Sequence, residues 1–454
     1  MSAFNVAKFG GTSVANFEAM SRCAVIIENN PSTKLVVSSA CSGVTNLLVE
    51  LALGVHNPND RDAIFDDLRT IHYTVIEHFS DQTKTKQAID NILDTLKSMA
   101  EAASFQSSDK LTDHIVACGE LMSTHILTQL IVERGIDAVR FDIREVLRTN
   151  ADYGKAEPIL DKIDALAEQK LIPLCQKHVV ITQGFIGSDD EGTTTTLGRG
   201  GSDYSAALIA EAVKASGLEI WTDVPGIYTT DPRVAPKATP IPEISFSEAS
   251  EMANFGAKIL HPSTLLPALR HQIPVFVGSS RDPEKGGTWI RQQVESAPLY
   301  RALALRGNQT MVTLRSPNMF QAYGFLAQVF TILAKHQVSV DLITTSEVSV
   351  SLTLDQTNTS GKAPELPVEA RAELEELCIV DVEHNLSLVA LIGNKMSAKK
   401  GYAKQVFSAL EDFNLRMICY GASPHNLCFL VNSEEAKRAV QVLHQELFEK
   451  ITNR

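Results

Sequence analysis

The feature that most constrains the fold is an alternation, up to about residue 295, of short apolar β-branched runs with amphipathic helical stretches. Five runs have the composition of strands: FNVAKF, KLVVSSA, HVVITQGFIG, LEIWTDV and IPVFVGSS. Between residues 80 and 127 the pattern is helical, and AIDNILDTLKSMAEAA carries apolar residues at spacings of three and four. Strands that alternate with helices predict an α/β fold with an open, mainly parallel sheet between helices.

The C-terminal third contains an internal repeat. The segment GFLAQVFTILAKHQVSVDLITTSEVSVSL begins at Gly324 and GYAKQVFSALEDFNLRMICYGASPHNLCF begins at Gly401, so one ungapped offset of 77 residues relates the two. Each copy has the pattern of an amphipathic helix, a turn and a strand, with further strands before and after. Two copies are too few for a solenoid, and they predict two small α+β units packed side by side.

A domain boundary is expected in or just after residues 282–300, which combine Gly, Pro and mixed charge. The predicted domains are therefore 1–295, 310–385 and 386–454. Three domains agree with the roughly two to four expected for a chain of 454 residues.

Composition excludes several classes of protein. Hydrophobic residues make up 44% of the chain and charged residues 21%, which is ordinary globular usage. The 41 basic and 54 acidic residues give a net charge of -13 without a block of Lys and Arg, which argues against binding to nucleic acid or a membrane surface. The seven cysteines form no C-x-x-C pair, and there is no apolar leader and no run of 18 apolar residues, so a cytoplasmic location is expected.

The stretch TTTTLGRGGSDYSAA, residues 193–207, has three glycines in four positions before a helical pattern. It is neither a P-loop, which needs G-x-x-x-x-G-K-[ST], nor a dinucleotide fingerprint, which needs a glycine where Asp203 stands. Glycines at a helix start can nevertheless present backbone N–H groups to an anion. Taken alone, the stretch is equally consistent with a Gly-rich turn before a helix.

Polar residues also follow the predicted strands, where open α/β sheets bind their ligands. The candidates in the first half of the chain are Lys8, Gly10 and Gly11 in KFGGTSV, Ser39, Gly43 and Thr45 in SSACSGVTNLL, and Glu120 in HIVACGELMS. Those further along are Thr222, Asp223, Tyr228, Asp231 and Arg233 in WTDVPGIYTTDPR, and Lys258 in FGAKILHP. Each has an ordinary alternative, such as a strand-end turn or a capping Asp. Glu120 is expected at a helix start among apolar and small residues, where few polar neighbours explain it.

Taken together, KFGGTSV, VTNLL, GELMS, TTLGRGGSDYSAA, WTDVPGIYTTDPR and FGAKILHP resemble the aspartokinases of the amino-acid kinase family. The duplicated tail resembles that family's tandem ACT domains, which are α+β units of ferredoxin-like fold. The resemblance covers nearly the whole chain and is nearest to the single-function, lysine-sensitive members. Because the chain ends at Arg454, directly after the second ACT-like unit, no homoserine dehydrogenase domain is expected.

The resemblance implies transfer of a phosphoryl group from ATP to the side-chain carboxylate of L-aspartate. That carboxylate is ionised at neutral pH, so no general base is needed, and catalysis should consist of positioning and cations. Lys8 would stabilise the transition-state charge, and Asp203 would orient Lys8. Arg199 would bind the substrate's α-carboxylate and Glu120 its α-ammonium, with Ser39 and Thr45 lining the pocket.

The resemblance also implies a nucleotide site in which Mg²⁺ bridges the phosphates with few direct protein ligands. Its implied residues are Lys8, Gly10, Gly11, Gly200, Gly201, Thr222, Asp223, Tyr228, Arg233 and Lys258.

Lysine inhibition requires a site with carboxylates for the ligand's ammonium groups. At the 77-residue offset Asp341 corresponds to Ile418 and Glu347 to Pro424, so the acidic pair exists only in the first copy. A capping Asp and a solvated Glu are the alternative. The residues expected at this site are Ser339, Val340, Asp341, Thr345, Ser346 and Glu347. By resemblance, Met319, Phe325 and Leu326 would close the pocket. ACT domains commonly pair, so a homodimer through residues 300–454 is expected.

Two other functions stay open at this point. One is a kinase of the same fold with another acceptor, such as glutamate, carbamate or uridylate. The other is a non-catalytic amino-acid sensor, against which the joint presence of Lys8, Arg199 and Asp203 argues.

Overall fold

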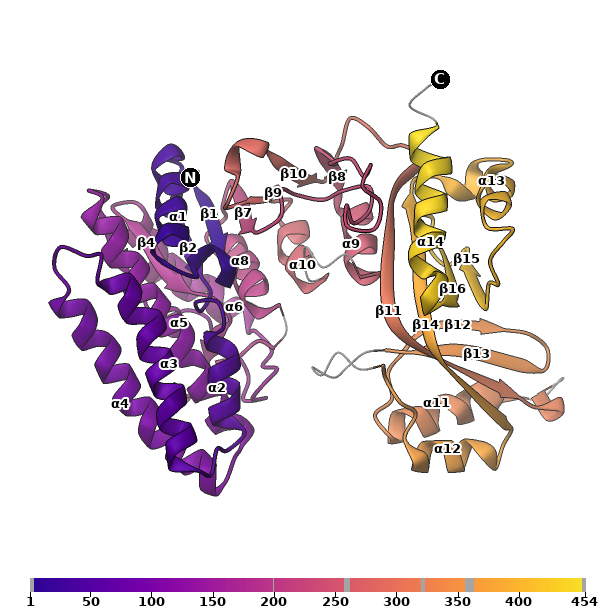
Figure 1. Ribbon diagram of the computed structural model, residues 1–454, viewed down its shortest axis with the longest axis horizontal. Helices are drawn as coiled ribbons and strands as arrows, with labels where there is room; N and C mark the ends of the chain where they lie inside the picture. The colour runs from indigo at the N-terminus through magenta and orange to yellow at the C-terminus, as the bar shows by residue number, and fades with distance from the viewer. Residues whose placement is uncertain (1–3, 199, 257–261, 320–322, 356–362, 451–454) are drawn as a thin grey trace. The chain divides into compact units, whose positions relative to one another are not determined.

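The computed structural model describes residues 4–198, 200–256, 262–319, 323–355 and 363–450 (Figure 1). They form two compact units. The first unit comprises residues up to 227, 240–246 and 259–294, and the second comprises 228–239, 247–258 and 295 onwards.

The first unit is built on an eight-stranded sheet in the order β3-β4-β2-β1-β7-β9-β10-β8. Its neighbours pair in parallel, apart from the antiparallel pair of β10 and β9. The five predicted strands are confirmed, as β1 (Asn5–Phe9), β2 (Thr33–Ser38), β4 (Val179–Gln183), β7 (Gly217–Thr222) and β9 (Val275–Ser279). The other strands are β3 (Ala138–Arg140), β8 (Glu243–Ser245) and β10 (Gly287–Arg291), with β5 (Ile186–Ser188) and β6 (Thr194–Thr196) forming a separate hairpin.

Helices pack on both sides of this sheet, as burial of both faces of a parallel sheet requires (Figure 1). Helix α5 contacts β2, β3 and β4, and α1 to α4 contact α5 or one another, whereas α8 contacts β1, β2 and β7. The helices of this unit are α1 (Phe17–Asn29), α2 (Val44–Ala52), α3 (Pro58–Ile76), α4 (Thr83–Phe105), α5 (Asp109–Glu133), α6 (Leu160–Leu166), α7 (Ile172–Cys175), α8 (Gly201–Ala212) and α10 (Pro262–Arg270).

Helix α5 is the helix of the described residues that is long and apolar enough to cross a membrane by length and composition. Within its most apolar window, 72% of the residues are buried inside the structure. Residues such as Ile115, Met122 and Ile126 belong to the core of the first unit. The helix therefore has the burial of a core helix.

One local expectation is wrong, and it concerns the place of Glu120 in its helix. Glu120 does not lie at a helix start: the helix begins at Asp109, capped by the Ser108 side chain, and Glu120 lies in its middle. The apolar pattern of this helix continues without a break through Gly119. The sequence near Glu120 therefore contains no signal for the start or the end of a helix.

The second unit contains an antiparallel six-stranded sheet in the order β12-β13-β11-β14-β16-β15. The predicted repeat is confirmed, because α11 (Phe325–Lys335), β12 (Val340–Thr345) and β13 (Ser349–Leu354) recur as α13 (Tyr402–Ala409), β15 (Met417–Tyr420) and β16 (Asn426–Asn432). The helices α12 (Val368–Glu375) and α14 (Ser433–His444) complete the two copies.

Two long strands, β11 (Tyr300–Arg315) and β14 (Ile379–Gly393), join the copies into one sheet (Figure 1). Val312 of β11 and Val380 of β14 lie in the core of the first copy, while Leu303 and Val389 lie in the core of the second. The second copy therefore includes the N-terminal half of β11, a contribution that the sequence repeat does not indicate.

Two earlier segments of the chain also belong to the second unit. Helix α9 (Phe246–Asn254) carries Glu248, which accepts hydrogen bonds from Arg301 at 2.7 Å and from Asn394 at 2.5 Å. In the segment 228–239, the Thr229 carbonyl accepts a 2.7 Å hydrogen bond from the Leu303 backbone. The unit that contains the repeat thus also includes two segments, 228–239 and 247–258, that come well before the repeat in the sequence.

Candidate active site

A cavity of about 570 Å³ opens in the first unit where β1, β2 and β7 end. Because these strands are neighbours and parallel, the loops at their carboxyl ends converge there. The predicted residues that line the cavity are Lys8, Gly10, Gly11, Ser39, Gly43, Thr45, Glu120, Gly200, Gly201, Asp203, Thr222 and Asp223.

Lys8 and Asp203 form an ion pair within the cavity wall. Lys8 lies on β1 and is 8% exposed, and its Nζ is 2.5 Å from Oδ1 of Asp203 in the first turn of α8. A buried pair of this kind holds a cation at a fixed place next to the loops of the cavity. The arrangement can stabilise negative charge that develops on a bound phosphoryl group.

Glu120 is a buried carboxyl group that has no counter-charge in contact among the described residues. It is 4% exposed, and its Oε1 accepts a 3.2 Å hydrogen bond from the Ala40 backbone, whereas Oε2 has no hydrogen-bond partner among the described residues. Burial raises the pKa of Glu120 to about 8, against the lowering effects of hydrogen bonds and of Lys8. An ammonium group in the cavity would supply the missing partner and favour the ionised form.

The glycine-rich loop leads into α8. Gly200 precedes the helix with a φ of 69°, in the left-handed region that glycine adopts readily, and no side chain caps the first N–H groups of the helix. Uncapped N–H groups at a helix N-terminus that faces a cavity are suited to binding a phosphate. Arg199 lies outside the described residues.

Gly11, in the loop after β1, lies close to the loop after β2, and these two loops form another part of the cavity wall. A Cβ on Gly11 would lie 2.9 Å from the Ala40 carbonyl oxygen, so any larger residue would push the two loops apart. The loop after β2 is also fixed from α5, because the Ser123 hydroxyl donates a 2.7 Å hydrogen bond to the Ser39 carbonyl.

The nucleotide residues predicted from β7 onwards are divided between the two units. Thr222 and Asp223 line the cavity, and the Thr222 hydroxyl donates to the Asp223 carboxylate at 3.2 Å. Tyr228 and Arg233 belong to the second unit, where Arg233 forms an ion pair with Asp231 at 2.7 Å. Lys258 lies outside the described residues.

Sequence reasoning missed part of the cavity lining. The additional residues are Thr12, Ala40, Cys41, Ser42, Asn46, Phe185 and Ser202. Most of them are direct neighbours of predicted residues in the same loops. Phe185 is the exception: it follows β4 with a φ of 68°, a conformation that nothing in its local sequence signals.

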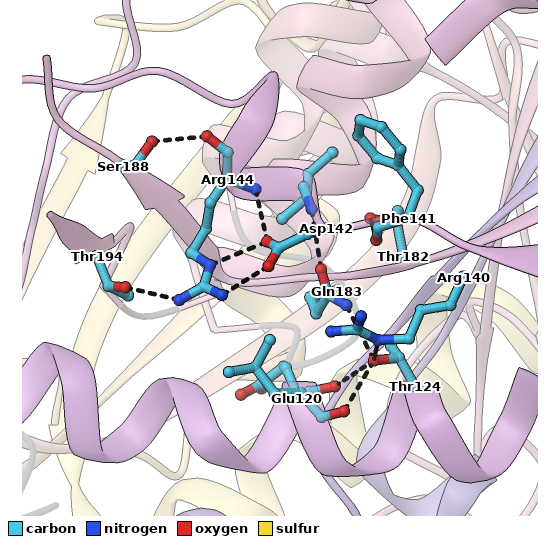
Figure 2. Close-up of polar contacts among 12 residues, drawn as sticks. Glu120, Thr124, Arg140, Phe141, Asp142, Arg144, Thr182, Gln183, Ser188 and Thr194 are labelled. Atoms are coloured by element: carbon cyan, nitrogen blue, oxygen red, sulfur yellow. Dashed lines mark hydrogen bonds and ion pairs between the residues drawn. The ribbon is translucent and has the colours of Figure 1, made fainter. Parts of the chain in front are cut away.

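A polar network behind Glu120 was missed as well (Figure 2). The Thr124 hydroxyl donates to the Glu120 carbonyl at 2.9 Å and accepts from Nε2 of Gln183 at 3.0 Å and from Nε of Arg140 at 3.3 Å. The side-chain oxygen of Gln183 accepts from the Ile143 backbone at 2.9 Å. These bonds fasten α5 to the end of β4 and to the segment after β3.

The residues predicted for an effector lie in the first copy of the repeat. The Asp341 carboxylate contacts the Arg306 guanidinium, and the Ser339 hydroxyl donates to Asp355 at 3.3 Å. Ser346 and Ser349 close a turn after β12 by a 2.8 Å backbone hydrogen bond, and Glu347 in that turn is exposed. Of the remainder, Val340 and Thr345 lie on β12, Met319 and Phe325 pack against the core of the copy, and Leu326 is exposed.

The amino acid kinase family model matches residues 3–279, and an ACT domain model matches residues 312–361 and 389–447. Over 450 residues the chain is 54% identical to the lysine-sensitive aspartokinase 3 of Escherichia coli, covering 99% of this chain and all of that protein. The chain is an aspartokinase of the amino acid kinase family.

Other aspartokinases align over the same span. Aspartokinase 1 of Arabidopsis thaliana, a chloroplast protein, is 32% identical over 98% of this aspartokinase and 80% of its own length. The crystal structure of E. coli aspartokinase III with aspartate and ADP has a TM-score of 0.89 at 54% identity, covering 98% of this chain and all of that one. The structure with lysine and aspartate has a TM-score of 0.83, covering 98% and 99%.

Proposed function

We propose that this aspartokinase transfers the γ-phosphoryl group of ATP to the side-chain carboxylate of L-aspartate and is inhibited by lysine. In the step itself an aspartate side-chain oxygen forms a bond to the γ-phosphorus, and the bond to the β–γ bridging oxygen breaks, so that ADP leaves with the electron pair. No proton moves, because the carboxylate is already ionised. The products are 4-phospho-L-aspartate and ADP.

The single observation that carries the proposal is the buried Glu120 carboxyl, whose Oε2 has no hydrogen-bond partner in the described part of the chain, in the cavity that Lys8 also lines. An α-amino acid supplies an ammonium for Glu120, whereas carbamate and uridylate supply none. Lys8, held by Asp203, provides charge for the transferring phosphoryl group, which a sensor without turnover does not need. By family resemblance Arg199 takes the substrate's α-carboxylate, and Ser39 and Thr45 line its pocket.

ATP is expected at the glycine-rich loop and at the end of β7, with Tyr228, Arg233 and Lys258 added by resemblance. Mg²⁺ supplies neutralisation of phosphate charge in reactions of this class. Mg²⁺ would be held mainly through the phosphate and water oxygens, and Asp223 is a carboxylate in the cavity lining that would face it, while Asp203 holds Lys8.

The lysine site is proposed at the first copy of the repeat. Asp341 lies on β12 and Glu347 in the turn that follows it, so the strand alone places about 13 Å between their backbone positions. We therefore expect the two carboxylates that hold one lysine to come from two chains. This reasoning supports the homodimer expected through residues 300–454, which light scattering at micromolar protein with lysine present would test; a monomer would contradict it.

The domain limits 1–295, 310–385 and 386–454 are proposed with this division of roles. A cytoplasmic location is also proposed. In support, the seven cysteines are all free, as is usual where thiols stay reduced.

One assay tests the function as a whole. Aspartyl hydroxamate formation in the presence of ATP, Mg²⁺ and hydroxylamine should require aspartate and should fall when lysine is added. A coupled assay for ADP, run with glutamate, carbamate and UMP as acceptors, separates the alternatives: turnover with one of these and not with aspartate would contradict the proposal.

A further inference from the structure

Asp113 is a buried acid to which the proposed reaction assigns no role. It lies near the start of α5, is 1% exposed, and does not line the cavity. Both carboxylate oxygens accept hydrogen bonds from Gly154 N, at 3.1 and 2.9 Å. Thr196 adds its backbone N–H at 3.0 Å and its hydroxyl at 2.6 Å. Burial raises the pKa of Asp113 above its ordinary value, although these donors favour the ionised carboxylate and oppose the shift.

The partners of Asp113 lead directly into the glycine-rich loop. Thr196 ends β6, two residues before Gly198, which lines the cavity. A Cβ on Gly198 would lie 3.3 Å from the Gly154 carbonyl oxygen, so the other partner packs against the same loop. Asp113 therefore fastens both the strand that enters the loop and the turn on which the loop rests.

Asp113 and Glu120 lie on one helix. A separation of seven residues is close to two turns, so both side chains leave the same side of α5, roughly 10 Å apart along its axis. Glu120 faces the cavity directly, and Asp113 holds the loop that forms another part of the cavity wall. One rigid helix thus sets the distance between the Glu120 carboxyl and the glycine-rich loop.

We propose that Asp113 is a positioning residue, which fixes the glycine-rich loop relative to Glu120 and so sets the fit of the aspartate substrate. The inference rests on the proposed function for its kinetic consequence. Its structural consequence, the ordering of the loop, does not depend on the identity of the substrate.

The principal variant is Asp113→Asn. Asparagine keeps the shape but has one acceptor oxygen, and its NH₂ group would face N–H donors. We expect the KM for aspartate to rise at least about fivefold, because Arg199, which by resemblance takes the substrate's α-carboxylate, belongs to this loop. The KM for ATP should rise as well, because ATP is expected at the same loop. Hydrogen–deuterium exchange in peptides covering residues 196–204 should become faster in the substrate-free protein.

The same hairpin offers a matched control at its far end. Asp189 is also buried, and it accepts hydrogen bonds from Glu191 N at 3.0 Å, Thr193 N at 2.8 Å and the Tyr153 hydroxyl at 3.0 Å. Asp189→Asn therefore alters a comparable set of bonds at the turn of the hairpin and leaves the bonds of Thr196 and Gly154 to Asp113 in place. Its KM for aspartate and its exchange at residues 196–204 should match the wild type.

A second pair of variants separates positioning from simple destabilisation. Thr196→Val removes the 2.6 Å hydroxyl bond to Asp113 at nearly constant shape and should reproduce the rise in the KM for aspartate. Thr196→Ser keeps the hydroxyl and should have the wild-type KM. Unchanged loop exchange in a folded Asp113→Asn protein would overturn the inference, as would an equal effect of Asp189→Asn. Failure of the wild type to phosphorylate aspartate would instead refute the proposed function, while the exchange data still decide the role of Asp113.

Discussion

The two proposed sites, one in each unit, hold their charged groups in opposite ways. In the first, Lys8 and Glu120 are 8% and 4% exposed and are fixed by an ion pair or a backbone hydrogen bond. In the second, the Asp341 side chain is 24% exposed next to Arg306, and Glu347 lies in an exposed turn. Buried, preorganised charge suits a reaction whose transition state needs charge in one place. Exposed carboxylates suit a ligand that binds and leaves as its concentration changes.

The largest expected effect follows from removing the fixed cation of the first unit. Lys8→Ala should lower kcat about a thousandfold and change the KM for aspartate much less, because the charge of Lys8 is needed mainly in the transition state. Steady-state kinetics with varied aspartate at saturating ATP measures both values. A variant with nearly normal kcat would remove Lys8 from the catalytic role.

The second effect tests the exposed carboxylates. Asp341→Ala and Glu347→Ala should each raise the lysine concentration for half-inhibition at least about tenfold, or about 1.4 kcal/mol, and leave the uninhibited kcat nearly intact. The measurement is a lysine titration of aspartyl hydroxamate formation. Inhibition that is unaltered in both variants would show that lysine binds elsewhere.

A smaller effect should follow from pH. The pKa of Glu120 is about 8 in the ligand-free protein, above its ordinary value, and the aspartate ammonium binds the ionised form. The KM for aspartate should therefore fall at least about fivefold between pH 6.5 and 8.5, and Glu120→Gln should abolish that dependence. The stability of the ligand-free protein should fall as pH rises from the ordinary pKa of 4.5 towards about 8, because in that range the unfolded chain releases the Glu120 proton while the folded protein keeps it. A flat KM profile in the wild type would contradict this role.

The smallest effect belongs to the second copy of the repeat. Ile418→Val and Pro424→Ala alter the residues that correspond to Asp341 and Glu347 without removing a charge. Each should shift the lysine concentration for half-inhibition by less than about twofold. If these changes abolished inhibition while Asp341→Ala had no effect, the effector would have been assigned to the wrong copy.

Much of the fold, and the place of several site residues in it, could be predicted from the sequence, because both depend on local patterns. Lys8 and Thr222 end parallel strands that are apolar and β-branched, and parallel strands bring their carboxyl ends to one edge of a sheet. The 77-residue offset matched α11 to α13 and β12 to β15 because the core positions of the two copies agree.

The rest depends on pairing between distant residues, which leaves no local signal. The N-terminal half of β11 joins the second copy through β14, more than 80 residues further along the chain. Asp113 has the sequence context of a solvated acid in the first turns of a helix, and only the fold brings Thr196 and Gly154 against it. The left-handed backbone of Phe185 is likewise imposed by its surroundings.

The most direct test of the division between the units is the binding of lysine to the Lys8→Ala variant, measured by isothermal titration calorimetry. Lys8 lies in the first unit, and the proposed lysine site lies wholly in the second. The account predicts a protein that has lost turnover but binds lysine with a dissociation constant within about threefold of the wild type, a difference that weak coupling between sites allows. Loss of lysine binding in a folded Lys8→Ala protein would contradict it, because the effector would then depend on the charge that carries out the chemistry.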